Sequence, residues 1–183
     1  MRSIFVLSIC LLGASFVFAQ NPVAAKQAAN ACGNSSVYFE VHKHHKYEEA
    51  PPIEKGKARI YIIESYGGQP APMYAGPIFR VGVDGHWVGA EQALSYLYFS
   101  VTPGKHHLCI NWQSRLLGRN RLIWLNSVAA QAGQTYYFQA VPLQDYDSTP
   151  IGISQLGLLD SDEAQLLLAE YPLAVSNIEP AYQ

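Results

Sequence analysis

The chain has 183 residues, enough for one domain of ordinary size, with 12 basic and 14 acidic side chains and a formal net charge of −2. Its residues are 49% hydrophobic and only 14% charged, which excludes an intrinsically disordered chain, since such chains combine low hydrophobicity with high net charge. The near-neutral balance lacks the basic face that nucleic-acid binding requires, and 14 glycines and 11 prolines argue against a helical bundle.

The first 19 residues are organised like a secretory signal peptide. Arg2 supplies the basic start, residues 4–18 are continuously apolar, and Val17 and Ala19 are small enough for a signal-peptidase cleavage site. The apolar stretch is shorter than the roughly 20 residues of a membrane-spanning helix, and Cys10 lies inside it rather than at a lipoprotein cleavage site. We therefore expect cleavage near Ala19 and a secreted or periplasmic product without a transmembrane anchor.

Removal of the signal peptide leaves two cysteines, Cys32 and Cys109. An even number of cysteines in an oxidising compartment favours a disulfide bond, which would contribute roughly 4 kcal/mol in the chain-entropy model. The alternatives are a buried pair of thiols or a reactive Cys109, with His107 on the same strand face as its base. We expect the disulfide, which would leave no reactive sulfur.

Alternating and β-branched segments predict a single domain of strands at residues 35–175, after a flexible leader at 20–34. Val37 to His42 alternates between apolar and polar residues, as a half-buried strand does. Asp84-Gly85 lies between two apolar runs, the strongest short signal for a hairpin. Further strands are expected at 57–65, 78–83, 86–89, 96–101, 106–112, 122–128, 135–141 and 151–159.

One helix is predicted near the end of the domain. Asp160 is a favourable N-cap, Glu163 stands at the spacing of a capping box, and Tyr171-Pro172 ends the helix. A tail is expected at 176–183. Short strands separated by frequent turns, followed by this helix, indicate a mainly β fold: an antiparallel β-sandwich or partly open barrel with one C-terminal helix.

Three short motifs follow one another in the order of a known bacterial pattern: Val83-Asp84-Gly85, Pro103-Gly104-Lys105-His106, and Ala132-Gly133-Gln134-Thr135-Tyr136-Tyr137. In this order they resemble the domain of unknown function 2846 family, which consists of exported or lipid-anchored bacterial β domains without an established activity. The resemblance covers roughly residues 55–170. It implies an envelope protein and brings no catalytic residues with it. Many relatives carry a lipobox cysteine, and this chain does not.

The histidines are the candidates for a metal site. Glu40, His42 and His44 alternate along one predicted strand and so point from one face, and His106 opens another strand. Zinc takes three or four such ligands, which adjacent strands can supply from His42, His44 and His106. The alternative is a solvated polar face, and the H-E-x-x-H motif is absent. We expect no cofactor, with zinc as the alternative.

Aromatic residues are the candidates for a binding surface. Tyr96 and Tyr98 project from the face of their strand opposite its apolar residues, and Trp87 lies on a neighbouring segment. An aromatic row of this kind can stack on sugar rings or on a partner protein. The alternative is that both faces of the strand are buried and the hydroxyls are hydrogen-bonded at the rim.

These observations predict a non-catalytic binding or scaffolding module of the bacterial envelope, whose partner is an envelope protein or a glycan. The enzymatic alternative is a metal-dependent hydrolase that uses the histidine cluster. A third reading is a purely structural partner in an envelope complex. A chelator separates the first two, because only the hydrolase would lose a metal ion and with it thermal stability.

Overall fold

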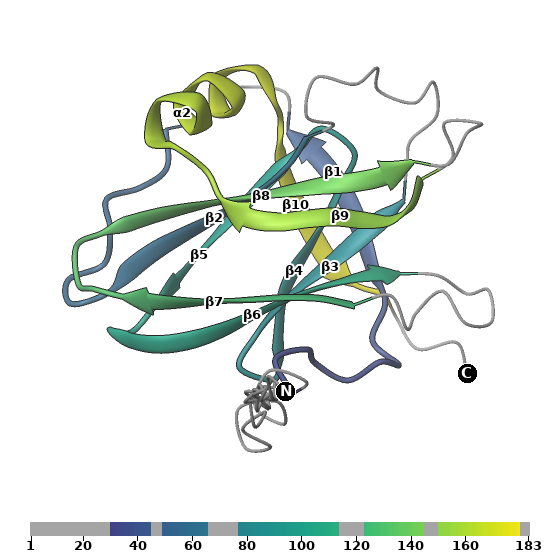
Figure 1. Ribbon diagram of the computed structural model, residues 1–183, viewed down its shortest axis with the longest axis horizontal. Helices are drawn as coiled ribbons and strands as arrows, with labels where there is room; N and C mark the ends of the chain where they lie inside the picture. Colours follow the sequence, from purple (N-terminus) through teal and green to yellow (C-terminus); the bar gives the residue numbers. More distant parts are fainter. Residues whose placement is uncertain (1–29, 45–48, 66–76, 114–122, 145–149, 180–183) are drawn as a thin grey trace, which may run out of the picture.

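The computed structural model describes residues 30–44, 49–65, 77–113, 123–144 and 150–179, in which two β-sheets face each other (Figure 1). The larger sheet has six strands in the order β1 (Phe39–His44), β10 (Leu173–Ile178), β5 (Tyr96–Val101), β2 (Ala58–Glu64), β8 (Thr135–Gln144) and β9 (Pro150–Leu158). The smaller sheet has four strands in the order β4 (His86–Gln92), β3 (Ile78–Val83), β6 (Gly104–Gln113) and β7 (Ile123–Ala130). The predicted mainly β, sandwich-like fold is confirmed.

Most neighbouring strands are antiparallel, as expected, but the six-stranded sheet also contains two parallel pairs, β2 with β8 and β10 with β5. Strand β10 was not foreseen at all. The sequence prediction ended the domain at residue 175 and left a tail, whereas Ser176 pairs with Val41 of β1 and its hydroxyl accepts a hydrogen bond from the Ala90 amide at 2.9 Å. The chain therefore returns to the sheet directly after Pro172.

The main core lies between the two sheets and is mostly apolar. It is built from the inward-facing residues of β2, β3, β5, β6 and β8, with Ile60, Phe79 and Phe138 among the fully buried ones. The expected hairpin between β3 and β4 is present, with Asp84 and Gly85 both at positive φ (50° and 89°). Those angles are the ones a two-residue type I′ turn requires.

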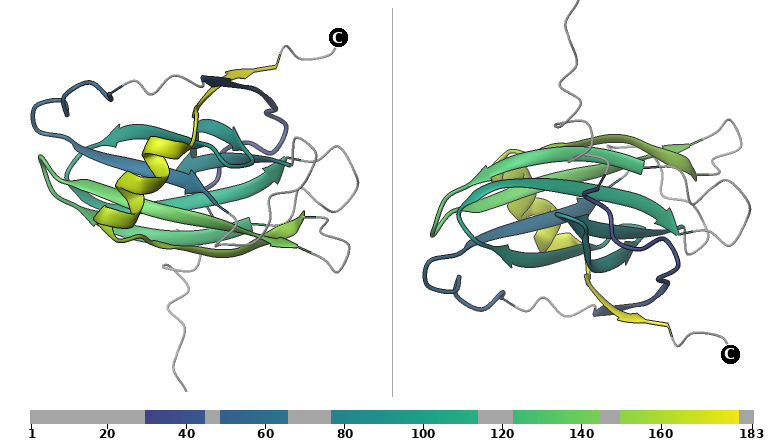
Figure 2. Two further views of the ribbon diagram at one scale, coloured as in Figure 1. Left: turned by 90° about the horizontal axis from the view of Figure 1, so that it is seen from above. Right: turned by 90° about the horizontal axis from the view of Figure 1, so that it is seen from below.

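The predicted helix is α2 (Ser161–Glu170), which lies across the outer face of the six-stranded sheet (Figure 2). The Asp160 carboxylate caps it by accepting a hydrogen bond from the Asp162 amide at 2.8 Å. Ala164 and Leu168 are the buried residues of the helix, and they pack on a second cluster that contains Tyr61 and other outward residues of the sheet. The larger sheet is thus covered on both faces.

The predicted disulfide bond joins Cys32 to Cys109 on β6, with the two Cα atoms 5.2 Å apart. Within the segment expected as a flexible leader, Ala31 is fully buried. Trp87 covers Gly33 with its ring and donates from Nε1 to the Asn34 carbonyl at 2.7 Å. The disulfide and this contact fasten the start of the domain to the smaller sheet.

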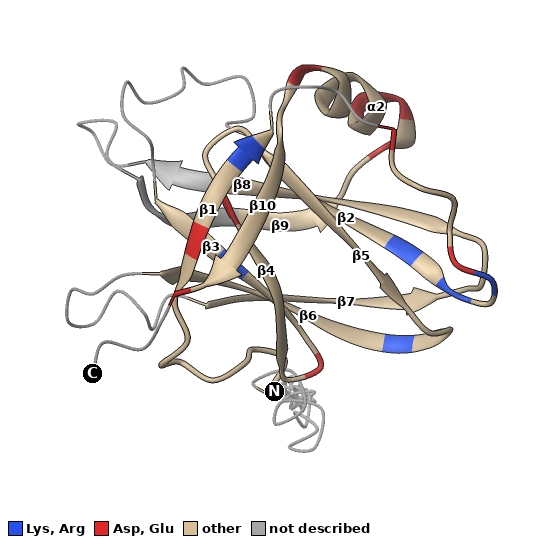
Figure 3. Ribbon diagram, turned by 180° about the vertical axis from the view of Figure 1, so that it is seen from behind, with Lys and Arg blue, Asp and Glu red and all other residues tan. Residues whose placement is uncertain are grey.

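Within the described residues, no helix is long and apolar enough to cross a membrane. Charged residues of both signs are scattered along the described strands and turns without forming one extended basic face (Figure 3). The predicted signal peptide lies outside the described residues.

Candidate functional site

The three aromatic residues predicted as a binding surface fall on different sheets. Tyr96 and Tyr98 lie on the outer face of β5, opposite the apolar residues that enter the main core, as predicted. Trp87 lies on β4 of the smaller sheet, where its ring packs 4.7 Å from the guanidinium carbon of the buried Arg80. Tyr96 and Tyr98 therefore belong to one site, and Trp87 has a structural role elsewhere.

Tyr61 is the centre of a tyrosine cluster on the outer face of the six-stranded sheet. Its ring centroid lies 5.2 Å from that of Tyr137, with the planes only 26° apart, and 5.4 and 6.1 Å from those of Tyr98 and Tyr96. The sheet register explains the arrangement, since β2 lies between β5 and β8 and Tyr61 is directly paired with Tyr98 on one side and Tyr137 on the other. Three adjacent strands thus contribute rings to one patch.

Sequence reasoning missed Tyr61 and Tyr137. Tyr61 stands between Ile60 and Ile62 in a strand of which all seven residues are buried, so burial does not distinguish the two faces of this strand. Tyr137 is one of two successive tyrosines, and only the pairing of β8 with β2 decides which of them turns outward. Side chains alternate between the two faces along each of these strands, and this period of two was the available signal. Alternation alone does not say which strands are neighbours, so it could not bring Tyr61 and Tyr137 together with Tyr96 and Tyr98.

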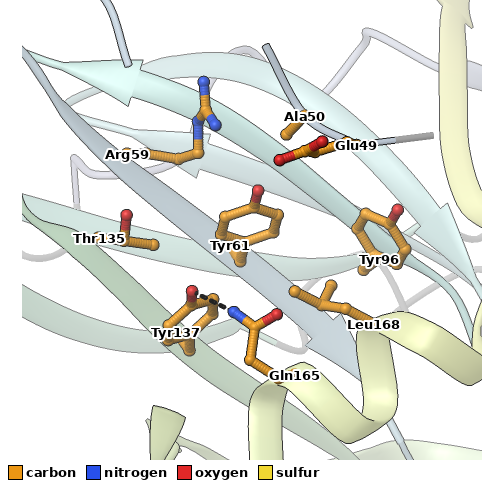
Figure 4. Close-up of a pocket in the computed structure, with 9 residues that line it drawn as sticks. All are labelled: Glu49, Ala50, Arg59, Tyr61, Tyr96, Thr135, Tyr137, Gln165 and Leu168. Carbon is orange, nitrogen blue, oxygen red and sulfur yellow. Dashed lines mark hydrogen bonds between the residues drawn. The ribbon is translucent and has the colours of Figure 1, made fainter. Parts of the chain in front are cut away.

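A cavity of about 230 Å³ lies between the tyrosine cluster and α2 (Figure 4). The Gln165 side chain extends from the helix toward the sheet, and its Nε2 donates to the Tyr137 hydroxyl at 2.8 Å. The Tyr61 hydroxyl points to the side of the cavity on which Arg59 and Glu49 lie. The full lining is Glu49, Ala50, Arg59, Tyr61, Tyr96, Thr135, Tyr137, Gln165 and Leu168, which we call the tyrosine pocket.

Arg59 brings a positive charge to the wall of the tyrosine pocket. It is only 7% exposed, one of its Nη atoms donates to the Pro51 carbonyl, and its guanidinium carbon lies 5.1 Å from the centre of the Tyr98 ring. Its Nε atom is buried without a hydrogen-bond partner among the described residues. Glu49 supplies a carboxylate on the exposed side, so the two formal charges of the pocket cancel.

The hydroxyl groups of the pocket are suited to hydrogen bonding rather than to proton abstraction. Burial raises the pKa of Tyr61, and the hydrogen bond and positive charge of Arg59 offset only part of this rise. Tyr61 therefore stays protonated at neutral pH and is able to donate. The lining contains no histidine or cysteine, and so it presents no set of soft metal ligands.

The predicted metal ligands are not brought together by the fold. His42 and His44 lie on the exposed face of β1, as the strand pattern predicted, and His42 Nε2 is 3.5 Å from a Glu40 oxygen. His106 lies on the other sheet, with Nδ1 2.6 Å from the Asp84 carboxylate and Nε2 2.7 Å from the Thr102 carbonyl. Both of its ring nitrogens thus face oxygen acceptors. No three His, Cys, Asp or Glu side chains in the described ranges gather in a way that could hold a metal ion.

Comparison of the chain with protein-family models, curated proteins and solved structures finds no match. The interpretation of the site therefore depends on its own chemistry.

Proposed function

We propose that the protein is an exported, non-catalytic binding module of the bacterial envelope, and that its tyrosine pocket receives one sugar ring of a glycan. The observation that supports this proposal is the combination of stacked tyrosine rings with polar groups of both kinds around one cavity. Export is supported by the signal-peptide pattern of residues 1–19 and by the disulfide bond. The resemblance to exported bacterial β domains agrees with the same compartment.

The pocket chemistry fits a neutral, polyhydroxylated ring. The tyrosine rings offer flat apolar surface for the C–H face of a sugar, and aromatic side chains combine such a face with a polar rim. Arg59 donates, Glu49 accepts, and Gln165 does both, which suits hydroxyl groups that are donors and acceptors at once. Because the charges of Arg59 and Glu49 cancel, neither an anion nor a cation gains a net advantage.

The size of the pocket also limits the ligand. At about 230 Å³ the cavity is smaller than the roughly 300–1,000 Å³ of pockets that enclose a drug-sized molecule. It has room for a single ring unit. Because Glu49 is exposed, the pocket is open to solvent on that side, and the rest of a longer chain would lie in solvent there. A terminal or looped-out sugar of a glycan satisfies this restriction.

The test is a titration of the mature protein with N-acetylglucosamine and its β-linked oligomers, followed by saturation-transfer NMR and calorimetry. Glu49→Gln and Gln165→Ala alter exposed pocket groups and leave the fold intact. Glu49→Gln should weaken binding by about tenfold, since a hydrogen bond to a charged group contributes about 1.5–3 kcal/mol. Gln165→Ala should weaken it by a smaller factor, since a hydrogen bond between neutral groups contributes about 0.5–1.5 kcal/mol. Tyr136→Phe is the matched control, because among the described residues the Tyr136 hydroxyl bonds only to the backbone at Ala129 and Gln131. Equal binding by all variants, or binding of none of these sugars, would refute the proposal.

A further inference from the structure

Two glutamates are buried at the end of the main core, and the described residues compensate their carboxylates poorly. Glu64 ends β2 on the larger sheet, Glu91 lies on β4 of the smaller sheet, and both side chains are 0% exposed. No described atom meets the geometry of a hydrogen bond to their four carboxylate oxygens, although the Ala93 backbone N–H acts on Glu64 and lowers its pKa. An ionised carboxylate in such a position is strongly disfavoured, so the pair must hold a proton or receive a compensating charge.

Among the described residues, Lys43 is the only positively charged group that acts on Glu64. Its charge offsets only part of the negative charge that the two glutamates would carry. It reaches in from β1 and is half-buried, but its Nζ donates to the Ala93 carbonyl at 2.5 Å rather than to a carboxylate. One ammonium group is set against two carboxyl groups, and Glu91 faces Glu64 as a like charge. Charge balance therefore requires that one of the two glutamates be protonated in the folded protein.

The same groups hold the bend that connects the two sheets between β4 and β5. Ala93 and Leu94 both have positive φ, 29° and 49°, which residues with a side chain adopt only when neighbouring contacts impose it. Lys43 holds the Ala93 carbonyl, and the Glu64 amide donates to the Ser95 carbonyl at 2.9 Å. The bend is thus fixed on one side by the Lys43 ammonium and on the other by the residue that carries the buried acid.

This bend leads directly into the tyrosine pocket. The residue after Ser95 is Tyr96, which is 4% exposed, lines the cavity, and donates from its amide to the Pro172 carbonyl at 3.1 Å. A change in the backbone at residues 93–95 therefore moves one wall of the pocket. Allosteric coupling needs an element with two arrangements that both sites bias. The strained bend is the candidate for this element, because it contacts Lys43 and Glu64 on one side and continues into Tyr96 on the other.

We propose that the Glu64–Glu91 pair is a proton-dependent switch on the bend at residues 93–95, so that ligand binding in the tyrosine pocket depends on pH. This inference rests on the proposed function for its ligand, though not for the movement of the bend. While the pair holds its proton, the buried site carries no excess charge and the bend keeps Tyr96 in place. When the proton leaves, two buried carboxylates repel each other and Lys43 is drawn from the Ala93 carbonyl toward them.

The direction of the effect follows from burial. Desolvation raises the pKa of Glu64 to about 8 against the opposing attraction of Lys43, and burial together with the charge of Glu64 raises the pKa of Glu91 well above its usual range. The pair therefore keeps its proton at neutral pH and loses it under mildly alkaline conditions. Tyr96 is therefore held in the pocket wall at neutral pH and is released under mildly alkaline conditions.

The experiment measures backbone hydrogen exchange and sugar binding on the full mature protein at about pH 6 and about pH 9, with exchange expressed as protection relative to the free amide. Protection of the Glu64 and Tyr96 amides, and affinity for N-acetylglucosamine, should each fall by about tenfold or more, since one pKa unit of differential interaction corresponds to a factor of about ten. Glu91→Gln keeps the shape of the side chain without its charge and should remove the pH dependence. Glu40→Gln, an exposed acid on β1, is the matched control and should behave like the native protein.

The two proposals fail separately. Unchanged protection of Glu64 and Tyr96 between the two pH values overturns the switch, whether or not the sugar binds. A pH dependence that persists in both Glu91→Gln and Glu64→Gln also overturns it. Loss of protection at high pH in a protein that binds no sugar at any pH supports the movement of the bend and refutes the proposed ligand instead.

Discussion

The two faces of strand β2 are equally buried but differ completely in chemistry. On the inner face, Ile60 and Ile62 enter a core made of apolar side chains from both sheets. On the outer face, Tyr61 lies among three further tyrosines and beside the buried guanidinium of Arg59. One strand thus separates a region that needs only matching volumes from one in which each hydroxyl and N–H group needs a partner.

This difference indicates that the outer face does more than stabilise the fold. Aliphatic side chains would cover the outer face at a lower free-energy cost, because they bury no polar groups. A buried polar group without a partner costs about 1–3 kcal/mol. The structure instead keeps an unpartnered Arg59 Nε atom and an open cavity under α2. Departures of this kind from optimal packing are expected at functional sites.

Neighbouring rings that point to opposite faces of the sheet should differ most in what they contribute to stability. Phe138 is fully buried in the inner core, and Phe138→Ala should lower the free energy of unfolding by about 3–5 kcal/mol through lost burial and a residual cavity. Tyr137→Ala, one residue away, should cost only about 1–2 kcal/mol because the side chain is half-buried and borders a cavity already. Urea unfolding measures both, and equal losses would contradict the distinction between the faces.

A second prediction concerns the acid pair at the edge of the inner core. The folded-state pKa of Glu64, about 8, lies above the ordinary value of 4.5, so the folded protein binds the proton more tightly than the unfolded chain. The resulting stability is fully present below about pH 4.5 and is lost as pH rises through about 8. The urea midpoint should therefore fall steadily across this interval.

Glu64→Gln removes this titration and should flatten the dependence of the urea midpoint on pH. Glu54→Gln is a suitable control, because Glu54 is exposed and paired with Lys57. A native protein whose midpoint rises between about pH 5 and 8 would contradict the sign of the raised pKa.

Local patterns made most of the fold predictable. The period-two alternation located β1 and β5, the Asp84-Gly85 pair located the hairpin, and Asp160 with Pro172 bounded α2. Strand β10 was not predicted, because its short segment directly follows a helix. It becomes a strand only by pairing with β1, which lies over a hundred residues away in the chain. Its stability comes from tertiary contacts that no local pattern encodes.

The site was only half predictable for a related reason. Alternation along one strand correctly placed Tyr96 and Tyr98 on one face. The partners Tyr61 and Tyr137 come from strands whose order and register are set by long-range pairing, including a parallel pair that joins β2 to β8. Because the strand order could not be predicted, Trp87 was grouped with the tyrosines, although Trp87 belongs to the other sheet.

On the outer face, the buried cation Arg59 should contribute to both stability and the titration of Tyr61. Arg59→Gln removes a charged donor to the Pro51 carbonyl and the cation above the Tyr98 ring, and should lower the free energy of unfolding by about 1–3 kcal/mol. Because Arg59 lowers the pKa of Tyr61, the variant should also titrate this tyrosine at higher pH. The ultraviolet absorbance of tyrosinate follows this change. Lys57→Gln is the surface control, and a Tyr61 titration at unchanged or lower pH would show that Arg59 does not act on this hydroxyl.

The smallest effect is expected where the helix that covers the pocket begins. Asp160→Ala removes the carboxylate that caps α2 and should cost about 1 kcal/mol. Asp162→Ala leaves the cap in place and removes only a favourable charge in the first turn, for which a few tenths of a kcal/mol is the usual loss. Because α2 contributes Gln165 and Leu168 to the pocket and packs on the outer face alone, the loss at Asp160 should loosen the helix without weakening the inner core. Hydrogen exchange should accordingly increase within residues 161–170 and remain unchanged at Phe138. If exchange increases equally at both places, the two faces of the sheet unfold as one unit and the outer face is not an independent layer.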